Sequence, residues 1–203
     1  MILMRTLPNL LLAMILTTHI GCNNSATQAK LDSPDAAFSQ FKSMGEKKNF
    51  EGLYEILTPE AQDQTVMKMV SVVAMLKKMN DLPGGDNSDN EKNESATKAV
   101  AHAKKFGLTD ELLGNIKSIS RNENPAAQEA VKSLTDPKGY CCGVMKILSE
   151  QKGNSMAAGI ANATLTDVKI NGDTATGMIT MNGDTKERTF KKIDGSWRID
   201  SIN

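Results

Sequence analysis

The sequence predicts an α+β fold, in which N-terminal helices pack on a C-terminal four-stranded antiparallel meander and a large helical insertion lies between them. Apolar residues recur every three or four positions as far as about residue 160, which is the helical period, and from Ala161 they alternate with polar residues. Three turn dipeptides then divide the alternating segment into four strands. They are Asn171-Gly172, Asn182-Gly183 and Asp194-Gly195.

Capping residues and apolar spacing predict the first helices. Ser33-Pro34-Asp35 supplies a capping hydroxyl, a proline at the first helical position and an acid in the first turn, and apolar residues follow at helical spacing as far as Met44. A short second helix begins at Phe50. Thr58-Pro59-Glu60 repeats the cap, proline and acid, and starts a third helix that runs to about Asn80.

A polar segment, 80–95, interrupts the helices. It contains a Leu-Pro-Gly-Gly run followed by Asp, Asn, Ser, Glu and Lys, so we expect a mobile loop. Helical spacing resumes in the insertion, 96–160, and we expect 33–203 to form a single α+β domain. The predicted helical segments of the insertion are 96–106, 109–120, 125–135 and 140–152.

The three turns together predict a sheet with one apolar and one polar face. If each dipeptide is a two-residue turn, Val168 pairs with Ala175, Ala175 with Phe190, and Phe190 with Ile199, while Ile170 falls in the row of Trp197. Leu165 and Met178 then lie on the polar face. The apolar face collects Val168, Ile170, Ala175, Ile179, Met181, Phe190, Trp197 and Ile199.

The start of the chain has the pattern of an export signal. Arg5 is its only charge, an apolar run covers 10–16, and Gly21 precedes Cys22. A cleavable segment that ends in a small residue before a cysteine resembles a bacterial lipoprotein signal, in which that cysteine is lipidated.

We therefore expect 1–21 to be a signal peptide and 22–32 to be a tether. Lipid on Cys22 would anchor the protein to a membrane of the bacterial cell envelope. The alternative is an ordinary secretory signal with an incidental cysteine, because His19 stands where lipoprotein signals usually carry an aliphatic residue.

Composition excludes several classes of partner. The chain has 24 basic and 24 acidic residues, so no basic excess favours nucleic acid. After the signal only His102 remains of two histidines, and no Cys-x-x-Cys motif occurs, so we expect neither a metal site nor a cofactor. Cys141 and Cys142 are adjacent, which disfavours a disulfide between them. We expect small apolar side chains in a helix, with an intermolecular disulfide as the alternative.

Both ends of the folded part resemble one known family. The motifs SPDAAF (33–38), EKKNFEGLY (46–54) and LTPE (57–60) resemble the opening helices of the nuclear transport factor 2-like, or cystatin-like, superfamily. NGDTA (171–175) and FKKIDGSWRI (190–199) are similar to the terminal hairpins of its small lipoprotein members. The resemblance spans 31–60 and 164–203, and it implies a cystatin-like roll, in which helices line a curved antiparallel sheet shaped as a cone.

A polar row on the apolar face is the candidate ligand-binding site. The predicted register aligns Thr166, Gly177, Arg188 and Ser201, and Gly177 leaves room beside the arginine. In a cone-shaped fold this row would orient a ligand inside an otherwise apolar pocket. The alternative is that Arg188 lies near the rim and extends to water, because a single bulge would move residues to the other face.

The same register argues against an enzyme. Enzymes of the resembling superfamily, such as ketosteroid isomerase and scytalone dehydratase, place acid–base residues inside the cone. The predicted inner face has no His, Tyr or Glu, and its one acid, Asp173, lies beside a turn. His102 is expected on the polar flank of an insertion helix. We therefore predict no catalytic residues.

Two further groups have structural explanations. Met67, Met69, Met75 and Met79 recur at helical spacing among valines, which favours core filling over copper binding or a binding groove. Lys186, Arg188, Lys191, Lys192 and Arg198 make a small basic excess, which is usually a solvated sheet face but could contact anionic headgroups or polymer.

These observations predict a non-enzymatic envelope lipoprotein, held on the membrane by lipid at Cys22, that binds a small apolar ligand or a partner protein. Two alternatives stay open at this point. One is an enzyme of the dehydratase or isomerase type that uses the cone interior. The other is a structural envelope subunit that assembles with copies of itself.

Overall fold

The computed structural model describes residues 30–81, 90–116, 125–151 and 156–200, in eight helices and one four-stranded sheet. The helices are α1 (Pro34–Glu46), α2 (Phe50–Glu55), α3 (Pro59–Asp81), α4 (Asn90–Lys105), α5 (Asp110–Asn115), α6 (Pro125–Lys132), α7 (Pro137–Ser149) and α8 (Met156–Ala161). The strands are β1 (Thr164–Asn171), β2 (Thr174–Met181), β3 (Asp184–Ile193) and β4 (Ser196–Ile199).

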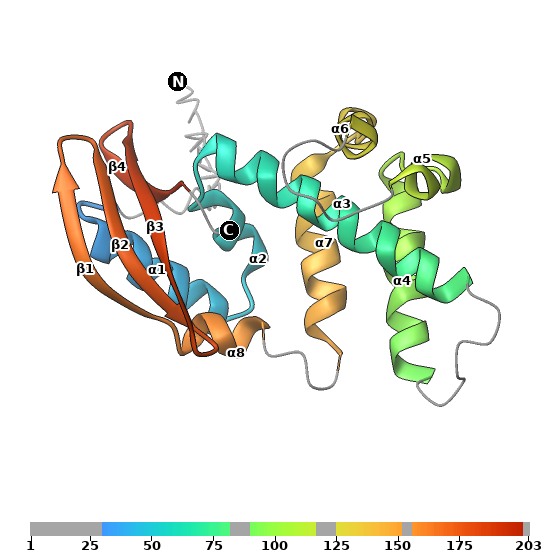
Figure 1. Cartoon of the computed structure of the whole chain (residues 1–203), viewed down its shortest axis with the longest axis horizontal. Coiled ribbons are helices and arrows are strands. Elements are labelled where there is room, and N and C mark those ends of the chain that lie inside the picture. Colours follow the sequence, from blue (N-terminus) through green and yellow to red (C-terminus); the bar gives the residue numbers. More distant parts are fainter. Residues whose placement is uncertain (1–29, 82–89, 117–124, 152–155, 201–203) are drawn as a thin grey trace, which may run out of the picture.

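The elements form two lobes that lie side by side (Figure 1). The sheet lobe contains β1–β4 with α1, α2 and α8. The helical lobe contains α3–α7, and the long α3 extends away from the sheet along its length. The predicted α+β class is confirmed, with N-terminal helices packed on a C-terminal antiparallel meander.

The predicted helix starts are confirmed by their caps. Ser33 Oγ accepts a hydrogen bond from the Ala36 amide at 3.0 Å, and Pro34 occupies the first turn. Thr58 Oγ1 likewise accepts from the Ala61 amide at 3.2 Å at the start of α3.

Several helix boundaries differ from the prediction. The helix α6 ends at Lys132 instead of 135, α7 ends at Ser149 instead of 152, and α8 was not among the predicted segments. The helix α4 begins at Asn90 instead of 96, so the part of the expected mobile loop at 90–95 is helical, and an ion pair of 2.6 Å between Glu94 and Lys98 supports this start. The part at 82–89 lies outside the described residues.

The helix α7 begins at Pro137 instead of 140, because the Asp136 carboxylate caps it by accepting from the Gly139 amide at 2.9 Å. The apolar spacing alone therefore placed both helix starts too late. Polar residues that favour helix extend α4, and the Asp136 cap extends α7.

The sheet has the order β1-β2-β3-β4, and two of its three predicted turns are confirmed. Asn182 and Gly183 have φ of 54° and 86°, and Asp194 and Gly195 have φ of 50° and 76°. Left-handed conformations at both central residues are those of a type I′ turn, which Asn-Gly and Asp-Gly favour. Ala175 pairs with Phe190 and Phe190 with Ile199, as predicted.

The register of β1 was predicted wrongly in two respects. The first turn is Gly172-Asp173, with φ of 61° at Gly172, so Asn171 pairs with Thr174 and Ile170, not Val168, pairs with Ala175. A bulge then follows, in which Asp167 adopts a φ of 53°. Because the bulge adds one residue to β1, it reverses which side chains face the core before it.

Two residues of β1 consequently exchange faces. Thr166 pairs with Met178 on the outer face of the sheet, where the prediction had placed it on the inner face. Leu165 pairs with Ile179 on the inner face, where the prediction had placed it outside.

Helices α1 and α8 cover the inner face of the sheet (Figure 1). Buried side chains of the core fill the space between them. Phe190 and Ile199 are fully buried there, and Trp197 lies on the same face. Phe38 and Phe41 of α1 stack with ring centroids 6.4 Å apart in the same core. Burial of these side chains is the main source of stability in this lobe.

The edge of the sheet at β4 is closed by the chain around α1 and α2. The Trp197 amide donates to the Leu31 carbonyl at 2.8 Å, and the Ile199 amide donates to the Ile56 carbonyl at 3.0 Å. The Thr58 amide in turn donates to the Ile199 carbonyl at 2.9 Å. These bonds join the segment after α2 to the last strand, so that α2 lies beside β4.

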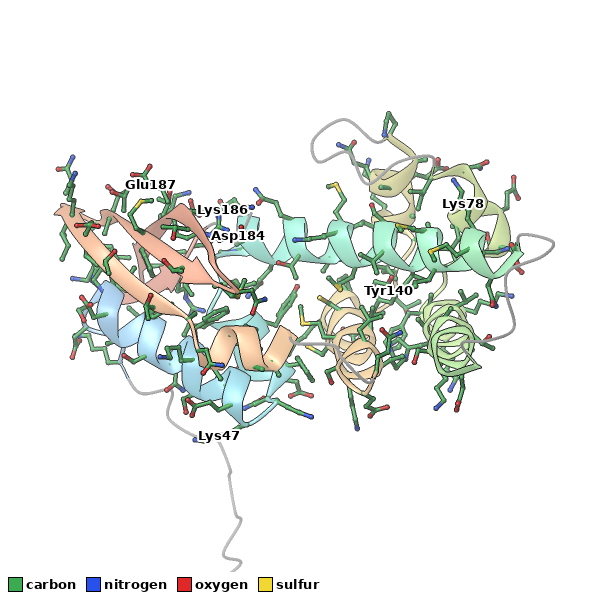
Figure 2. The ribbon with its side chains drawn as sticks, turned by 60° about the horizontal axis from the view of Figure 1, so that its bottom comes forward. Lys47, Lys78, Tyr140, Asp184, Lys186 and Glu187 are labelled. Carbon is green, nitrogen blue, oxygen red and sulfur yellow. The ribbon has the colours of Figure 1, made fainter. Side chains whose placement is uncertain are left out.

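Aromatic packing joins α4 to α7 inside the helical lobe, where Figure 2 shows Tyr140 between the helices. His102 lies against Phe106 with ring centroids 4.8 Å apart and stacks on Tyr140 at 6.2 Å. Its Nε2 is 3.2 Å from the Tyr140 carbonyl oxygen, and Gly143 leaves room for the imidazole. His102 therefore lies at a helix interface, and its predicted place on a polar flank was wrong.

Replacing Tyr140 by phenylalanine is expected to leave the free energy of unfolding unchanged or to raise it by up to about 1 kcal/mol. The Tyr140 hydroxyl is fully buried and has no hydrogen-bond partner within the described part of the chain, and a buried unsatisfied group costs about 1–3 kcal/mol. Urea unfolding of both proteins measures the difference. A loss of more than about 1 kcal/mol would show that the hydroxyl is hydrogen-bonded in the folded protein.

Candidate functional site

A cavity of about 250 Å³ lies in the sheet lobe between α1, α2, β4 and the segment before α1. Its apolar wall consists of Leu31, Met44 and Ile56. Polar side chains supply the rest of the lining, and they are Gln40, Asn49, Glu51, Glu55, Ser196 and Arg198. The cavity is therefore partly charged and smaller than most pockets for drug-sized molecules.

The short helix α2 forms one side of the cavity because of its N-terminal residues. Asn49 caps it by accepting a hydrogen bond from the Gly52 amide at 3.0 Å, and the Asn49 amide group also donates to the Met44 sulfur at 3.1 Å. A Cβ at Gly52 would lie 2.6 Å from that sulfur, closer than two such atoms can approach. Glycine thus lets α2 approach α1 closely, at the wall of the cavity.

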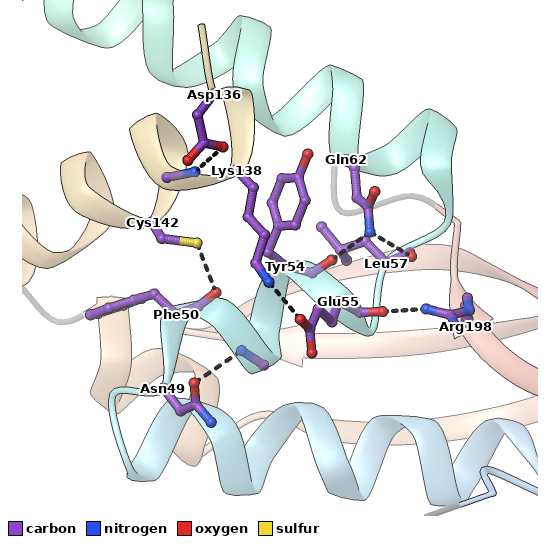
Figure 3. Close-up of polar contacts among 12 residues, drawn as sticks. Asn49, Phe50, Tyr54, Glu55, Leu57, Gln62, Asp136, Lys138, Cys142 and Arg198 are labelled. Atoms are coloured by element: carbon purple, nitrogen blue, oxygen red, sulfur yellow. Dashed lines mark hydrogen bonds and ion pairs between the residues drawn. The ribbon is translucent and has the colours of Figure 1, made fainter. Parts of the chain in front are cut away.

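Glu55 forms polar contacts with Lys138 of the helical lobe and with Arg198 of the sheet lobe, as Figure 3 shows. Its carboxylate accepts from Lys138 of α7 at 2.5 Å, and its backbone carbonyl accepts a hydrogen bond from the Arg198 guanidinium. The hydrogen bond to Glu55 is the main reason that the pKa of Lys138 lies above its ordinary value. Glu55 is therefore neutralised by Lys138, while Arg198 is held in place through a backbone atom.

Arg198 and Glu51 are lining charges that form no ion pair within the described residues, although Glu51 lies near enough to Lys138 to help raise the pKa of that side chain. Within the described residues, Arg198 has no carboxylate within ion-pair distance, and its one hydrogen bond uses a single N–H of the guanidinium. Glu51 also has no ion pair in the part of the chain that the structure describes. The guanidinium has five N–H donors, so most of its capacity is available for a ligand.

Chemically, the cavity can bind charged and polar groups. A guanidinium binds carboxylate or phosphate through paired hydrogen bonds, and a carboxylate accepts from an ammonium group. Among the described residues of the lining, Glu51 and Glu55 are the side chains that could exchange a proton with a bound molecule. The described residues also contain no group of three or more His, Cys, Asp or Glu that could hold a metal ion.

The polar row predicted from the sequence does not form. Thr166 lies on the outer face of the sheet because of the bulge in β1. Gly177 pairs with Arg188 as predicted, but the Leu165 side chain lies over this glycine, 2.7 Å from where a Cβ would stand. Arg188 is half-buried on the inner face. Ser201 and the predicted lipidation site, Cys22, lie outside the described residues.

The two adjacent cysteines are buried, unpaired side chains of α7. Burial raises the pKa of both thiols, that of Cys142 to about 11. The Cys142 thiol donates to the Phe50 carbonyl at 3.5 Å, which helps to pack α7 against α2. Both side chains therefore pack as small apolar groups, in agreement with the prediction.

The methionine prediction is confirmed for only half of its residues. Met69 is buried and Met67 packs against the core, but Met75 and Met79 are 47% and 54% exposed on the outer side of α3. Side chains four positions apart share one face of a helix, so these two lie together on the surface.

The basic residues predicted as one patch lie on both faces of the sheet. Lys191 and Arg198 pair across the outer face, whereas Lys186 and Arg188 project to the inner side. Lys191 also forms an ion pair of 3.0 Å with Asp200. The basic residues therefore do not form one continuous positive surface.

Comparison of the chain with models of protein families, with curated proteins and with solved structures finds no match. Among the described residues, no helix combines the length and the hydropathy needed to cross a bilayer.

Proposed function

We propose that this chain is an exported, lipid-anchored envelope protein that catalyses no reaction and binds a small anionic or partly anionic molecule in the cavity between α1, α2 and β4. The export pattern that ends at Cys22 supports the location and the anchor. The observation that carries the binding function is Arg198, a half-buried guanidinium at the cavity wall that has no carboxylate partner in the described residues.

A polar ligand is favoured over the apolar one that the sequence suggested. The inner face of the sheet, where an apolar ligand was expected, is filled by Phe190, Ile199 and the side chains of α1 and α8. The cavity beside β4 instead offers a guanidinium, two carboxylates and two amides on its wall. Charged and polar side chains outnumber the apolar ones in this lining, which favours a ligand with polar or charged groups.

A titration of the full-length protein, extracted in detergent, with N-acetyl-L-alanyl-L-alanine tests this function. The probe carries one carboxylate and no ammonium group. We expect measurable binding by calorimetry, and we expect Arg198→Gln to weaken it at least about tenfold, since a charged hydrogen bond contributes about 1.5–3 kcal/mol. Arg198→Lys keeps a donor for the Glu55 carbonyl and should also weaken binding, because it removes the paired donors.

Two control variants locate the binding. Lys186→Gln removes an exposed charge on β3 away from the cavity, and it should leave the affinity unchanged. Arg188→Gln removes the arginine of the site predicted from the sequence. Loss of binding in Arg188→Gln but not in Arg198→Gln would contradict the proposal and move the site to the inner face of the sheet.

A further inference from the structure

We infer that the ligand is a zwitterion, an amino acid or a short peptide with a free amino group and a free carboxylate. This inference rests on the proposed function and adds the second recognition group. Arg198 would bind the carboxylate, and Glu51 would accept from the ammonium group.

The positions of the two charges along α2 support this pairing. Arg198 is held at the C-terminal end of α2, because its guanidinium donates to the Glu55 carbonyl. Glu51 lies in the first turn of the same helix, four residues before Glu55. Backbone positions four apart on a helix differ by about 6 Å along its axis. The cation and the anion of the wall are thus placed at opposite ends of the same short helix.

The balance of charge in the cavity also favours a zwitterion. Lys138 pairs with Glu55 at 2.5 Å, and Glu51 and Arg198 are the negative and the positive charge of the lining that form no ion pair within the described residues. A purely anionic ligand would leave Glu51 next to a like charge, and a purely cationic ligand would leave Arg198 in the same position. A ligand with both charges matches each of them.

The uncharged part of the lining suits a peptide group. Gln40 of α1 lines the cavity and has no hydrogen bond in the described part of the molecule, and a side-chain amide can both donate to and accept from a peptide bond. Leu31, Met44 and Ile56 provide an apolar surface for a small side chain. The volume of about 250 Å³ limits the ligand to one or two residues.

Calorimetric titration of the full chain with L-alanyl-L-alanine, compared with its N-acetyl and C-amide forms, tests the inference. We expect the dipeptide to bind at least about tenfold more tightly than either blocked form. Glu51→Gln should bind the N-acetyl form and the free dipeptide with equal affinity, because the carboxylate that recognises the ammonium group is gone. Arg198→Gln should bind the C-amide form and the free dipeptide with equal affinity, because the guanidinium that recognises the carboxylate is gone.

The possible outcomes separate the two proposals. Equal or tighter binding of the N-acetyl form, lost in Arg198→Gln, would overturn the zwitterion inference and leave the anion-binding function standing. Failure of the dipeptide and of both blocked forms to bind would overturn both. Glu111→Gln, an exposed acid on α5 in the helical lobe, is the matched control and should bind like the unaltered protein.

Discussion

Replacing Ile199 by alanine is expected to lower the free energy of unfolding by about 2–5 kcal/mol. Ile199 is fully buried. It lies at the β4 end of a row of paired residues that crosses the whole sheet and includes Phe190 and Ala175. Its backbone also bonds to Ile56 and Thr58, so β4 cannot shift easily to fill the space that the side chain leaves. Urea unfolding of the variant and of the unaltered protein measures the loss.

Ile170→Ala is the matched control for this prediction. Ile170 lies at the other end of the same row and faces the same side, but it is 59% exposed. An exposed substitution of this kind usually changes stability by less than about 0.5 kcal/mol. Equal losses for Ile170→Ala and Ile199→Ala would contradict the observed register and the burial that it implies.

Gly45→Ala is expected to destabilise the sheet lobe by about 1–3 kcal/mol through overpacking. A Cβ at Gly45 would lie 2.3 Å from Cγ2 and 2.8 Å from Cβ of Ile160, so α8 would have to move away from α1. Because the second of these atoms is next to the backbone, a rotamer change alone does not relieve the clash. Urea unfolding of Gly45→Ala and of the unaltered protein measures the loss of stability.

Gly114→Ala provides the opposite expectation at another helical glycine. Nothing lies within 4 Å of a Cβ at Gly114, on the exposed side of α5. Alanine should therefore stabilise the protein by about 0.5–1 kcal/mol, since glycine has the higher entropy in the unfolded chain. A stabilising Gly45→Ala would contradict the close contact between α1 and α8.

The architecture could be predicted from the sequence where one local signal sufficed. Ser33 with Pro34, and Thr58 with Pro59, mark helix starts because capping depends on neighbouring residues alone. Asn182-Gly183 fixed the register of two strands because both residues accept a left-handed conformation.

The register of β1 could not be predicted in the same way. Asn171-Gly172 allowed more than one two-residue turn, and the structure uses Gly172-Asp173. The bulge at Asp167 left one signal in the sequence, because Leu165 is out of alternation with Val168 and Ile170, but that signal does not tell which residue is the extra one. One unpaired residue was sufficient to move Thr166 to the outer face and to remove the predicted polar row.

The cavity was missed because its residues come from distant parts of the chain. Leu31, Gln40, Glu51 and Arg198 meet only after the segment following α2 bonds to β4. Arg198 had been counted only as one of several basic residues of the sheet. A local signal existed in α2, where Glu51 and Glu55 stand four residues apart beside a glycine, but the role of Lys138 in neutralising one of them depends on tertiary packing.

The central claim is that the cavity between α1, α2 and β4 is the ligand-binding site. The most direct test is a series of amide correlation NMR spectra of the isotopically labelled full chain during titration with L-alanyl-L-alanine. We predict that the largest shifts occur at Gly52, Glu55 and Ser196, which line the cavity. Shifts concentrated at Gly177 and Arg188, or in the helical lobe, would contradict the account.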